Sequence, residues 1–357
     1  MFKRLGVLGK VVVGGAALLL ALVGMAPTSF AAPSAPSQAS APPTVHLAHK
    51  VTLGETSIDG PALSSVQDNF EGIHFLTAIA WTGTDALHHL NLLQSMDDPA
   101  NGVTHFKNKR TLGETSFVRP AVAQFGGGLG NTALAWVGTD KAHTLNFVWD
   151  AYGPTVGKSK ITLWGETSIG APALVQFGNN LILAWAGTDA NHSLNVLPFN
   201  ISTQKFGAKT VLRAFGSSAG PNLSVFKLTS GPELVLSWTT SAQALDYATS
   251  TDGVHFTPAL ALGPAPEFSA NASSVFYHQS DVGQRAFRAW TGIDPVHHVN
   301  IQWTTSFPDW PTPVTSKYVL AETALGGPQL AFNDGYLIAW TGTNPAHSLN
   351  VAAWDLY

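Results

Sequence analysis

The chain has 357 residues and a formal net charge of −4, and only 11% of its residues are charged. It contains no Cys, which excludes disulfides, cysteine-ligated zinc and a thiol nucleophile. The acidic balance argues against a nucleic-acid partner, because counterion release needs a basic surface. The 34 Gly and 22 Pro favour many short elements joined by turns.

The first 31 residues have the pattern of a secretory signal. Three basic residues within the first ten give a positive start, an apolar run of sixteen residues follows, and Ser29-Phe30-Ala31 supplies a small–x–small cleavage pattern. The apolar run is shorter than the ~20 residues that a spanning helix needs. We therefore expect cleavage, a Pro/Ser/Ala linker at residues 32–43, and a secreted protein without a membrane span, formed by residues 44–357.

After the linker, Val45–Thr56 (VHLAHKVTLGET) is a β-type run that ends in a recurring string. The string is Leu–Gly–Glu–Thr–Ser, followed by Pro six residues after the Glu. It returns in similar form along the chain, and its acidic residues are Glu55, Glu114, Glu166 and Glu322. Two further copies are partial: Phe215 keeps the spacing without the acid, and Glu267 keeps the acid without the Pro.

A second string, Trp–x–Gly–Thr–Asp–x–x–His–x–Leu–Asn, recurs with the same period. Five copies with few substitutions align without a gap, and they begin at Trp81, Trp136, Trp185, Trp290 and Trp340. A sixth, degenerate copy begins at Trp238 and lacks both the Gly and the His. The tryptophans are 49 to 55 residues apart, so the chain is built from repeats of this length.

Each repeat divides into four short β-type runs separated by turn residues, and no window shows a sustained helical period. In the third copy the runs are Ala173–Phe177, Leu181–Trp185, Ser193–Leu197 and Lys209–Leu212. A repeated four-stranded antiparallel unit of this length is typical of the blades of a β-propeller. The sequence therefore predicts an all-β fold, a six-bladed β-propeller of four-stranded antiparallel blades.

The two ends of the repeat region complement each other. The run Val45–Thr56 matches the fourth strand of a blade but has no preceding three, whereas the chain after Trp340 supplies only two or three more strands. We expect the N-terminal strand to pair with the C-terminal blade and so to close the ring. Residues 44–357 then form one domain.

The two strings should lie on one rim of this propeller. The Trp string contains the hairpin between the second and third strands of a blade, and the Glu string is the crossing to the next blade, so both emerge on the same side. An architectural interpretation places Trp81 between blades and assigns Asp85 to its own turn. It gives His88 a hydrogen bond across to Glu55 or Thr56. A functional interpretation sees shallow pockets between blades, where an aromatic face and polar groups bind sugars.

The candidate ligand-binding residues are the equivalent positions of these strings. They are Glu55, Thr56, Trp81, Asp85, His88, Asn91, Glu114, Trp136, Asp140, His143, Asn146, Glu166, Trp185, Asp189, His192, Asn195, Trp290, Asp294, His297, Asn300, Glu322, Trp340, Asn344, His347 and Asn350. The Asp–x–x–His spacing in a hairpin is not a known metal string, and common catalytic strings are missing. We therefore expect no metal and no cofactor, and we assign no catalytic residue.

The repeat region resembles the six-bladed propeller families, among them the sialidases and the propeller lectins. Ser250–Phe256 (STDGVHF) is similar to the Asp-box of sialidase-type propellers, a folding element on the turn between the third and fourth strands, but is one residue shorter. Sialidase activity implies an arginine triad, and we interpret the nearest string, Val118-Arg119-Pro120, as a chance match. The resemblance to propeller lectins implies sugar sites between blades.

These patterns favour a secreted, non-catalytic propeller. We expect it to bind glycans or a cell-surface polysaccharide through several weak sites on its rim, which together gain from avidity. Two alternatives stay open at this point. One is a sialidase-like glycoside hydrolase, and the other is a scaffold that binds protein through its rim.

Overall fold

The computed structural model describes residues 45–68, 74–95, 106–126, 131–152, 159–262, 271, 273–280, 283–305, 307, 316–332 and 335–356. The predicted signal and linker lie outside these ranges. The described residues form strands and turns without any helix, in agreement with the predicted all-β class. Within these ranges there is accordingly no helix of the length and apolarity that crossing a membrane requires.

Four sheets each hold the antiparallel strands of a single repeat. The first contains β2 (Ala62–Asp68), β3 (His74–Thr82), β4 (His89–Ser95) and β5 (Lys107–Thr115). The second contains β6 (Ala121–Gln124), β7 (Thr132–Val137), β8 (Thr144–Val148) and β9 (Lys160–Thr167). The third contains β10 (Ala173–Phe177), β11 (Asn180–Ala186), β12 (Ser193–Asn200), β13 (Lys205–Phe206) and β14 (Thr210–Gly216). The fourth contains β15 (Asn222–Leu228), β16 (Gly231–Thr239), β17 (Leu245–Ser250) and β18 (Leu260–Ala261).

A fifth sheet has seven strands in the order β1–β24–β23–β22–β21–β20–β19. Their bounds are β1 (Val45–Thr56), β19 (Ser274–Ser280), β20 (Gly283–Thr291), β21 (His298–Thr304), β22 (Ser316–Phe332), β23 (Tyr336–Gly342) and β24 (Ser348–Leu356). The long strand β22 pairs with β21 through its first half and with β23 through its second. The N-terminal strand β1 pairs antiparallel with the C-terminal strand β24, with Thr52 opposite Asn350.

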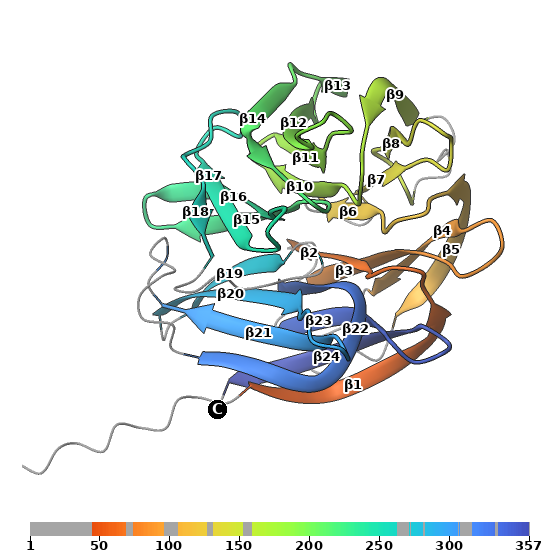
Figure 1. Cartoon of the computed structure of the whole chain (residues 1–357), viewed down its shortest axis with the longest axis vertical. Helices are drawn as coiled ribbons and strands as arrows, with labels where there is room; N and C mark the ends of the chain where they lie inside the picture. The colour runs from red at the N-terminus through yellow and green to blue at the C-terminus, as the bar shows by residue number, and fades with distance from the viewer. Residues whose placement is uncertain are drawn as a thin grey trace, which may run out of the picture. The chain divides into compact units, whose positions relative to one another are not determined.

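The sheets are arranged as in a β-propeller, with their inner strands toward the middle of the molecule (Figure 1). These inner strands touch in chain order: β2 contacts β6, β6 contacts β10, β10 contacts β15, β15 contacts β19, and β19 contacts β22. Three of the sheets that hold single repeats have four strands and the third sheet adds the two-residue strand β13, in agreement with the predicted four-stranded antiparallel unit. The seven-stranded sheet is continuous, so the sheets do not divide into six separate blades. The count of six blades and the closure of the ring remain predictions.

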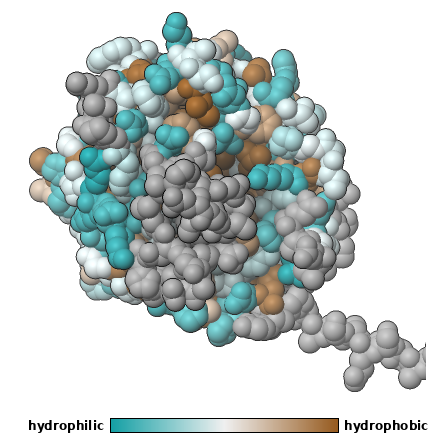
Figure 2. Space-filling model, turned by 180° about the vertical axis from the view of Figure 1, so that it is seen from behind, coloured by the Kyte–Doolittle hydropathy of each residue, from teal (hydrophilic) through white to brown (hydrophobic). Residues whose placement is uncertain are grey.

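The hydrophobic core lies between neighbouring sheets. Trp185 of the third sheet belongs to one cluster with Phe147 of the second, and Trp340 shares a cluster with Phe287 of β20. The second strand of each sheet has neighbours on both faces, so its side chains are buried on both faces, and all of β7 is buried. The outer surface is more polar: in Figure 2, hydrophilic residues are prominent around the edge of the molecule.

The crossings between repeats pack closely where they reach the inner strands. A methyl group on Gly60 would collide with the carbonyl oxygen of Gly327, and one on Gly220 would collide with that of Ala171. On Gly54 of β1 the same methyl group would meet nothing within 4 Å. Glycine at the inner ends is therefore required by the close approach of two backbones.

Replacing Gly60 with Ala is expected to lower the free energy of unfolding by about 1–3 kcal/mol, the usual cost of overpacking a closed site. The matched control Gly54→Ala should change it by less than about 0.5 kcal/mol, because its surroundings are open. Urea unfolding followed by tryptophan fluorescence measures both variants. Equal stability of G60A and G54A would contradict the close approach of the crossings.

Candidate functional site

The acidic residue of each Trp string closes its own hairpin. The carboxylate of Asp140 accepts hydrogen bonds from the N–H groups of Ala142 and Thr144 and from the Thr144 hydroxyl, at 2.9–3.4 Å. The corresponding backbone bonds recur at Asp85, Asp189 and Asp294. In the last copy the side-chain oxygen of Asn344 accepts the Ser348 N–H at 3.0 Å. The prediction that the Asp of the string closes its own turn is therefore confirmed.

The same hydrogen bonds keep the turn carboxylates ionised. Burial acts to raise the pKa of Asp140, but the hydrogen bonds from Thr144 and Ala142 outweigh it, so the pKa lies below the usual 3.8. The pKa values of the other turn carboxylates are lowered by the same balance, at Asp85, Asp189 and Asp294. At neutral pH these groups are therefore charged and engaged by their own turns.

The histidines of the string link the hairpin to the following crossing through their backbone. His88 has a left-handed φ of 57°, and its carbonyl accepts the Ser116 N–H at 3.1 Å. Its ring Nδ1 lies 3.2 Å from the Gly83 carbonyl oxygen. The partners of His88 are therefore Ser116 and its own turn, where the sequence predicted Glu55 or Thr56. The same backbone bond to a crossing recurs at His143, His192, His297 and His347.

The final Asn of the string is buried and joins the third strand to the fourth. Asn91 donates from its amide to the His89 carbonyl, and its side-chain oxygen accepts the Thr111 hydroxyl at 2.7 Å. The equivalent amides donate to the carbonyl two residues earlier, at Asn146, Asn195, Asn300 and Asn350. The bond to a threonine of the fourth strand recurs at Asn146 and Asn350, where it joins the two outer strands.

Each of five repeat tryptophans has a lysine over its ring, and the sequence did not predict these lysines as site residues. Lys109 Nζ is 5.7 Å from the centre of the Trp81 ring, within the range of cation–π attraction. The other pairs, at 5.1–5.9 Å, are Lys160 with Trp136, Lys209 with Trp185, Lys317 with Trp290 and Lys50 with Trp340. The indoles are at most 1% exposed, so they fill the space between sheets and present no open aromatic face.

Four of these lysines also pair with a glutamate of the neighbouring repeat. Lys109 Nζ of β5 lies 2.5 Å from a carboxylate oxygen of Glu55 of β1. At the next residue of β1, the hydroxyl of Thr56 lies 2.6 Å from that of Thr84. Because Thr56 belongs to the Glu string and Thr84 to the Trp string, the two strings meet at one place, as the sequence predicted.

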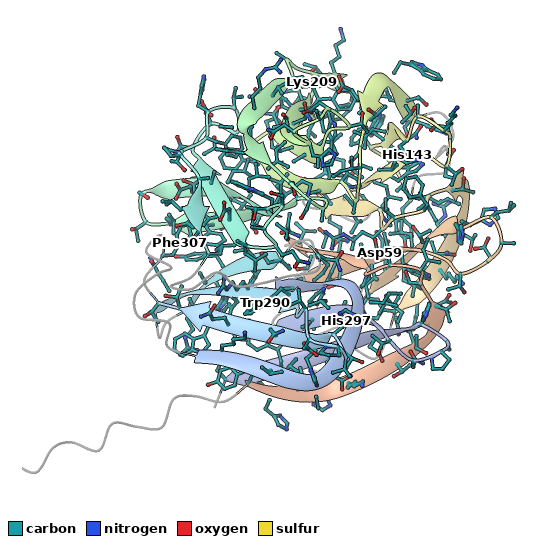
Figure 3. All side chains as sticks on the ribbon, in the orientation of Figure 1. Asp59, His143, Lys209, Trp290, His297 and Phe307 are labelled. Atoms are coloured by element: carbon teal, nitrogen blue, oxygen red, sulfur yellow. The ribbon has the colours of Figure 1, made fainter. Side chains whose placement is uncertain are left out.

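We call this set a rim cluster: the Glu and Thr of a crossing, the Thr of the next hairpin, and the Lys that pairs with the Glu. The complete rim clusters are Glu55–Thr56–Thr84–Lys109, Glu114–Thr115–Thr139–Lys160, Glu166–Thr167–Thr188–Lys209 and Glu322–Thr323–Thr343–Lys50. Their glutamates are 23–31% exposed and their lysines 32–42% exposed, so solvent reaches both charges. Figure 3 labels Lys209, which directly precedes β14 of the third sheet.

Two copies depart from this pattern. Phe215 stands where the other crossings have Glu, and its ring stacks on Trp238 with 4.9 Å between the centroids. In the other copy, Lys317 lies over Trp290, but Glu267 lies outside the described residues. The phenyl ring of Phe215 takes the place over Trp238 that a lysine takes over the other indoles. The packing of the tryptophan therefore does not require the charges of the rim cluster.

The sequence that resembles an Asp-box forms a turn held by its own side chains, between β17 and β18. The Ser250 hydroxyl accepts the N–H of Gly253, whose φ is 77°. Asp252 accepts the N–H groups of Val254 and His255, and the His255 side chain adds a further bond that lowers the pKa of Asp252.

Across the described part of the chain, no group of three or more His, Asp or Glu side chains could hold a metal ion.

No protein-family model matches the sequence, and no curated protein matches it either. Solved structures share the fold. A protein of unknown function from Dyadobacter fermentans has 12% identity and a TM-score of 0.55, over 88% of this chain and 99% of that chain. The Aleuria aurantia lectin in complex with α-methyl-L-fucoside has 9% identity and a TM-score of 0.51, over 85% and 96%. The Trypanosoma rangeli sialidase in complex with sialic acid has 11% identity and a TM-score of 0.52, over 87% of this chain but only 59% of that chain. Likeness at such identity shows the β-propeller fold alone.

Replacing Asp140 with Ala is expected to lower the free energy of unfolding at pH 7 by about 0.5–1.5 kcal/mol, because the turn loses its acceptor. Asp140→Asn should lose less, since Asn344 closes the equivalent turn. The lowered pKa means that the charge of Asp140 stabilises the fold above about pH 4 and that this contribution is lost as the pH falls through the folded-state value. Urea unfolding at about pH 7 and pH 2.5 tests this. The prediction is wrong if D140N is as unstable as D140A at pH 7.

Proposed function

We propose that the chain forms a closed propeller of six blades. Division of the seven-stranded sheet within β22 gives two blades of four strands each. Among the described residues, each repeat Trp lies in a separate hydrophobic cluster with side chains of the preceding repeat, and the cluster of Trp81 contains Leu337 and Val351 of the last repeat. The contact of β22 with β2 and the pairing of β1 with β24 also support closure.

We further propose that this propeller is a non-catalytic carbohydrate-binding protein whose rim clusters are equivalent sites. The carrying observation is that one exposed set of a carboxylate, an ammonium group and two hydroxyls recurs at four interfaces. The interface at Phe215 and Trp238 packs without it. The lysine chains also cover the indoles, but the charged groups recur although packing does not require them, which makes these groups the best candidates for recognition.

The chemistry of a rim cluster suits sugar hydroxyls. Glu55 offers acceptors, Lys109 offers donors, and the Thr hydroxyls offer both, so adjacent hydroxyls of one sugar ring find complementary partners. The Glu–Lys pair balances its own charge, which favours a neutral sugar. Because the indole beneath is buried, recognition depends on hydrogen bonds, and each site is expected to be weak. Several equivalent sites on one chain compensate through avidity on a glycan-coated surface.

Hydrolysis receives less support from this geometry. Glycosidases use a pair of carboxyl groups about 5–9.5 Å apart, whereas a rim cluster holds one, and a lysine engages it. A repeated site also suits multivalent binding better than a single reacting centre. Together with the signal pattern of residues 1–31, this leads us to propose a secreted protein whose partners are glycans or a cell-surface polysaccharide.

Substitution of all four rim-cluster lysines by Met (K50M, K109M, K160M and K209M) is expected to weaken binding to the best glycan of an array by about tenfold or more. Met keeps an apolar chain over the indole but removes the ammonium group, so the fold should persist, which the melting temperature verifies. Single substitutions should weaken binding in steps. Lys205→Met, an exposed lysine of β13, is the matched control. Unchanged binding by a folded fourfold variant would contradict the assignment of the rim clusters.

The chain is expected to release no chromophore from a panel of chromogenic glycosides under conditions in which it binds glycan saturably. Product formation measured over hours, with boiled protein as the control, tests this. Turnover proportional to protein concentration would replace binding by hydrolysis as the proposed function. Failure to bind any glycan, together with capture of a defined protein partner, would favour the scaffold alternative.

A further inference from the structure

The inner strands enclose a central cavity that the turns and rim clusters do not use. Its volume is about 840 Å³, and it is lined by β2, β6, β10, β15, β19 and β22. Pockets for small molecules range over ~300–1,000 Å³, so this cavity is large enough for an organic ligand. Much of its wall is aliphatic or aromatic, including Leu63, Val175, Leu223 and Phe276.

Arg119, which directly precedes Pro120 and β6, also lines this cavity. Its side chain is only 5% exposed, and its Nη1 atom has no hydrogen-bond partner among the described residues. Burial lowers the pKa of Arg119, and the charge of Asp59 opposes this shift. A buried cation without full pairing is costly for the folded state, so a group is expected to complete its coordination.

The position of Arg119 in the repeat is unusual. It stands immediately before the Pro of its crossing, where the corresponding crossings have Gly60, Ala171, Gly220 and Gly327. At Gly60 and Gly220 even a methyl group would collide with a neighbouring backbone. A long cationic side chain at such a position is not a requirement of the repeat, and it points to a function of this one crossing.

The carboxylate of Asp59 accepts hydrogen bonds from backbone N–H groups, including that of Arg119, and not from the Arg119 guanidinium. One carboxylate oxygen of Asp59 accepts the Arg119 N–H at 3.0 Å, and the other accepts the Gly60 N–H at 2.6 Å. Figure 3 labels Asp59. Lys227 and His278 also line the cavity, and no Asp or Glu is among its described lining residues, so the cavity suits an anionic ligand. The carboxylate of Asp59 beside Arg119 disfavours a second negative charge on that ligand.

We propose that the central cavity is a second binding site, for a small organic monoanion whose carboxylate pairs with Arg119 and whose apolar body lies against the cavity wall. The planar guanidinium matches the two oxygens of a carboxylate. The site is independent of the rim clusters. The string Val118-Arg119-Pro120 was interpreted from the sequence as a chance match. The proposed cavity site gives its arginine a role in the interior of the fold.

Thermal unfolding of the full chain tests this with octanoate as the probe and octanol as its uncharged counterpart. About 10 mM octanoate is ten times a weak Kd of about 1 mM and should raise the melting temperature by roughly 2 °C or more, whereas octanol and inorganic phosphate should not. Arg119→Met should abolish the shift. Its melting temperature without ligand should equal or exceed that of the wild type, because an unpaired buried charge is removed. Arg213→Met, which changes an exposed arginine of β14, is the matched control and should keep the full shift.

Equal octanoate shifts in the wild type and in R119M would overturn the proposal, and so would the lack of a shift in the wild type with both octanoate and benzoate. If R119M does not fold, Arg119→Lys takes its place: it keeps the charge but loses the planar fork, and its shift should be clearly smaller. Glycan binding by R119M on the array should equal that of the wild type. Failure of the cavity site is therefore distinguishable from failure of the rim clusters.

Discussion

Each repeat packs its tryptophan against the sheet of the preceding repeat, and the other features of the molecule follow from this contact. A four-stranded sheet has two apolar faces and cannot bury both alone, so neighbouring sheets must stack. The indole of Trp81 fills this interface completely and is covered by Lys109. Once the indole is fixed, the crossing and the hairpin beside it meet, and Glu55 reaches the lysine of the adjacent repeat. The packing between repeats and the placement of the rim clusters thus have one origin.

Within the repeated strings, the polar residues divide into two groups. Asp140 closes its own turn, the His143 carbonyl bonds the following crossing, and Asn146 bonds its own strand and Thr162 of the next one, so these residues serve the architecture. Glu55 and Lys109 pair with each other and are partly exposed, and the interface at Phe215 and Trp238 packs without such charges, so we propose these charged groups as contacts for a ligand. The central cavity differs in kind, because it depends on Arg119, a residue that appears at one crossing only. The two proposed sites are therefore of different kinds, one repeated and one singular.

Much of this architecture could be predicted from the sequence. Alternating β-type runs and turn residues predicted four of the five strands of the third sheet and missed the two-residue strand β13, and β1 has the bounds of the predicted run. The lysines were missed because Lys109 finds Glu55 in another repeat, and a string reports only neighbours along the chain. The partner of His88 was predicted wrongly, because its left-handed backbone presents a carbonyl to Ser116. Arg119 was not predicted as a site residue, because the string Val118-Arg119-Pro120 shows neither that the side chain is buried nor that it lacks a partner.

A crystal structure of the full chain, soaked with the glycan that binds best on the array, tests the rim-cluster assignment most directly. We predict sugar density at the rim clusters, with ring hydroxyls within hydrogen-bond distance of Glu55 and Lys109 and of their equivalents. Sugar bound only in the central cavity, or on a surface away from every Glu–Lys pair, would contradict the assignment.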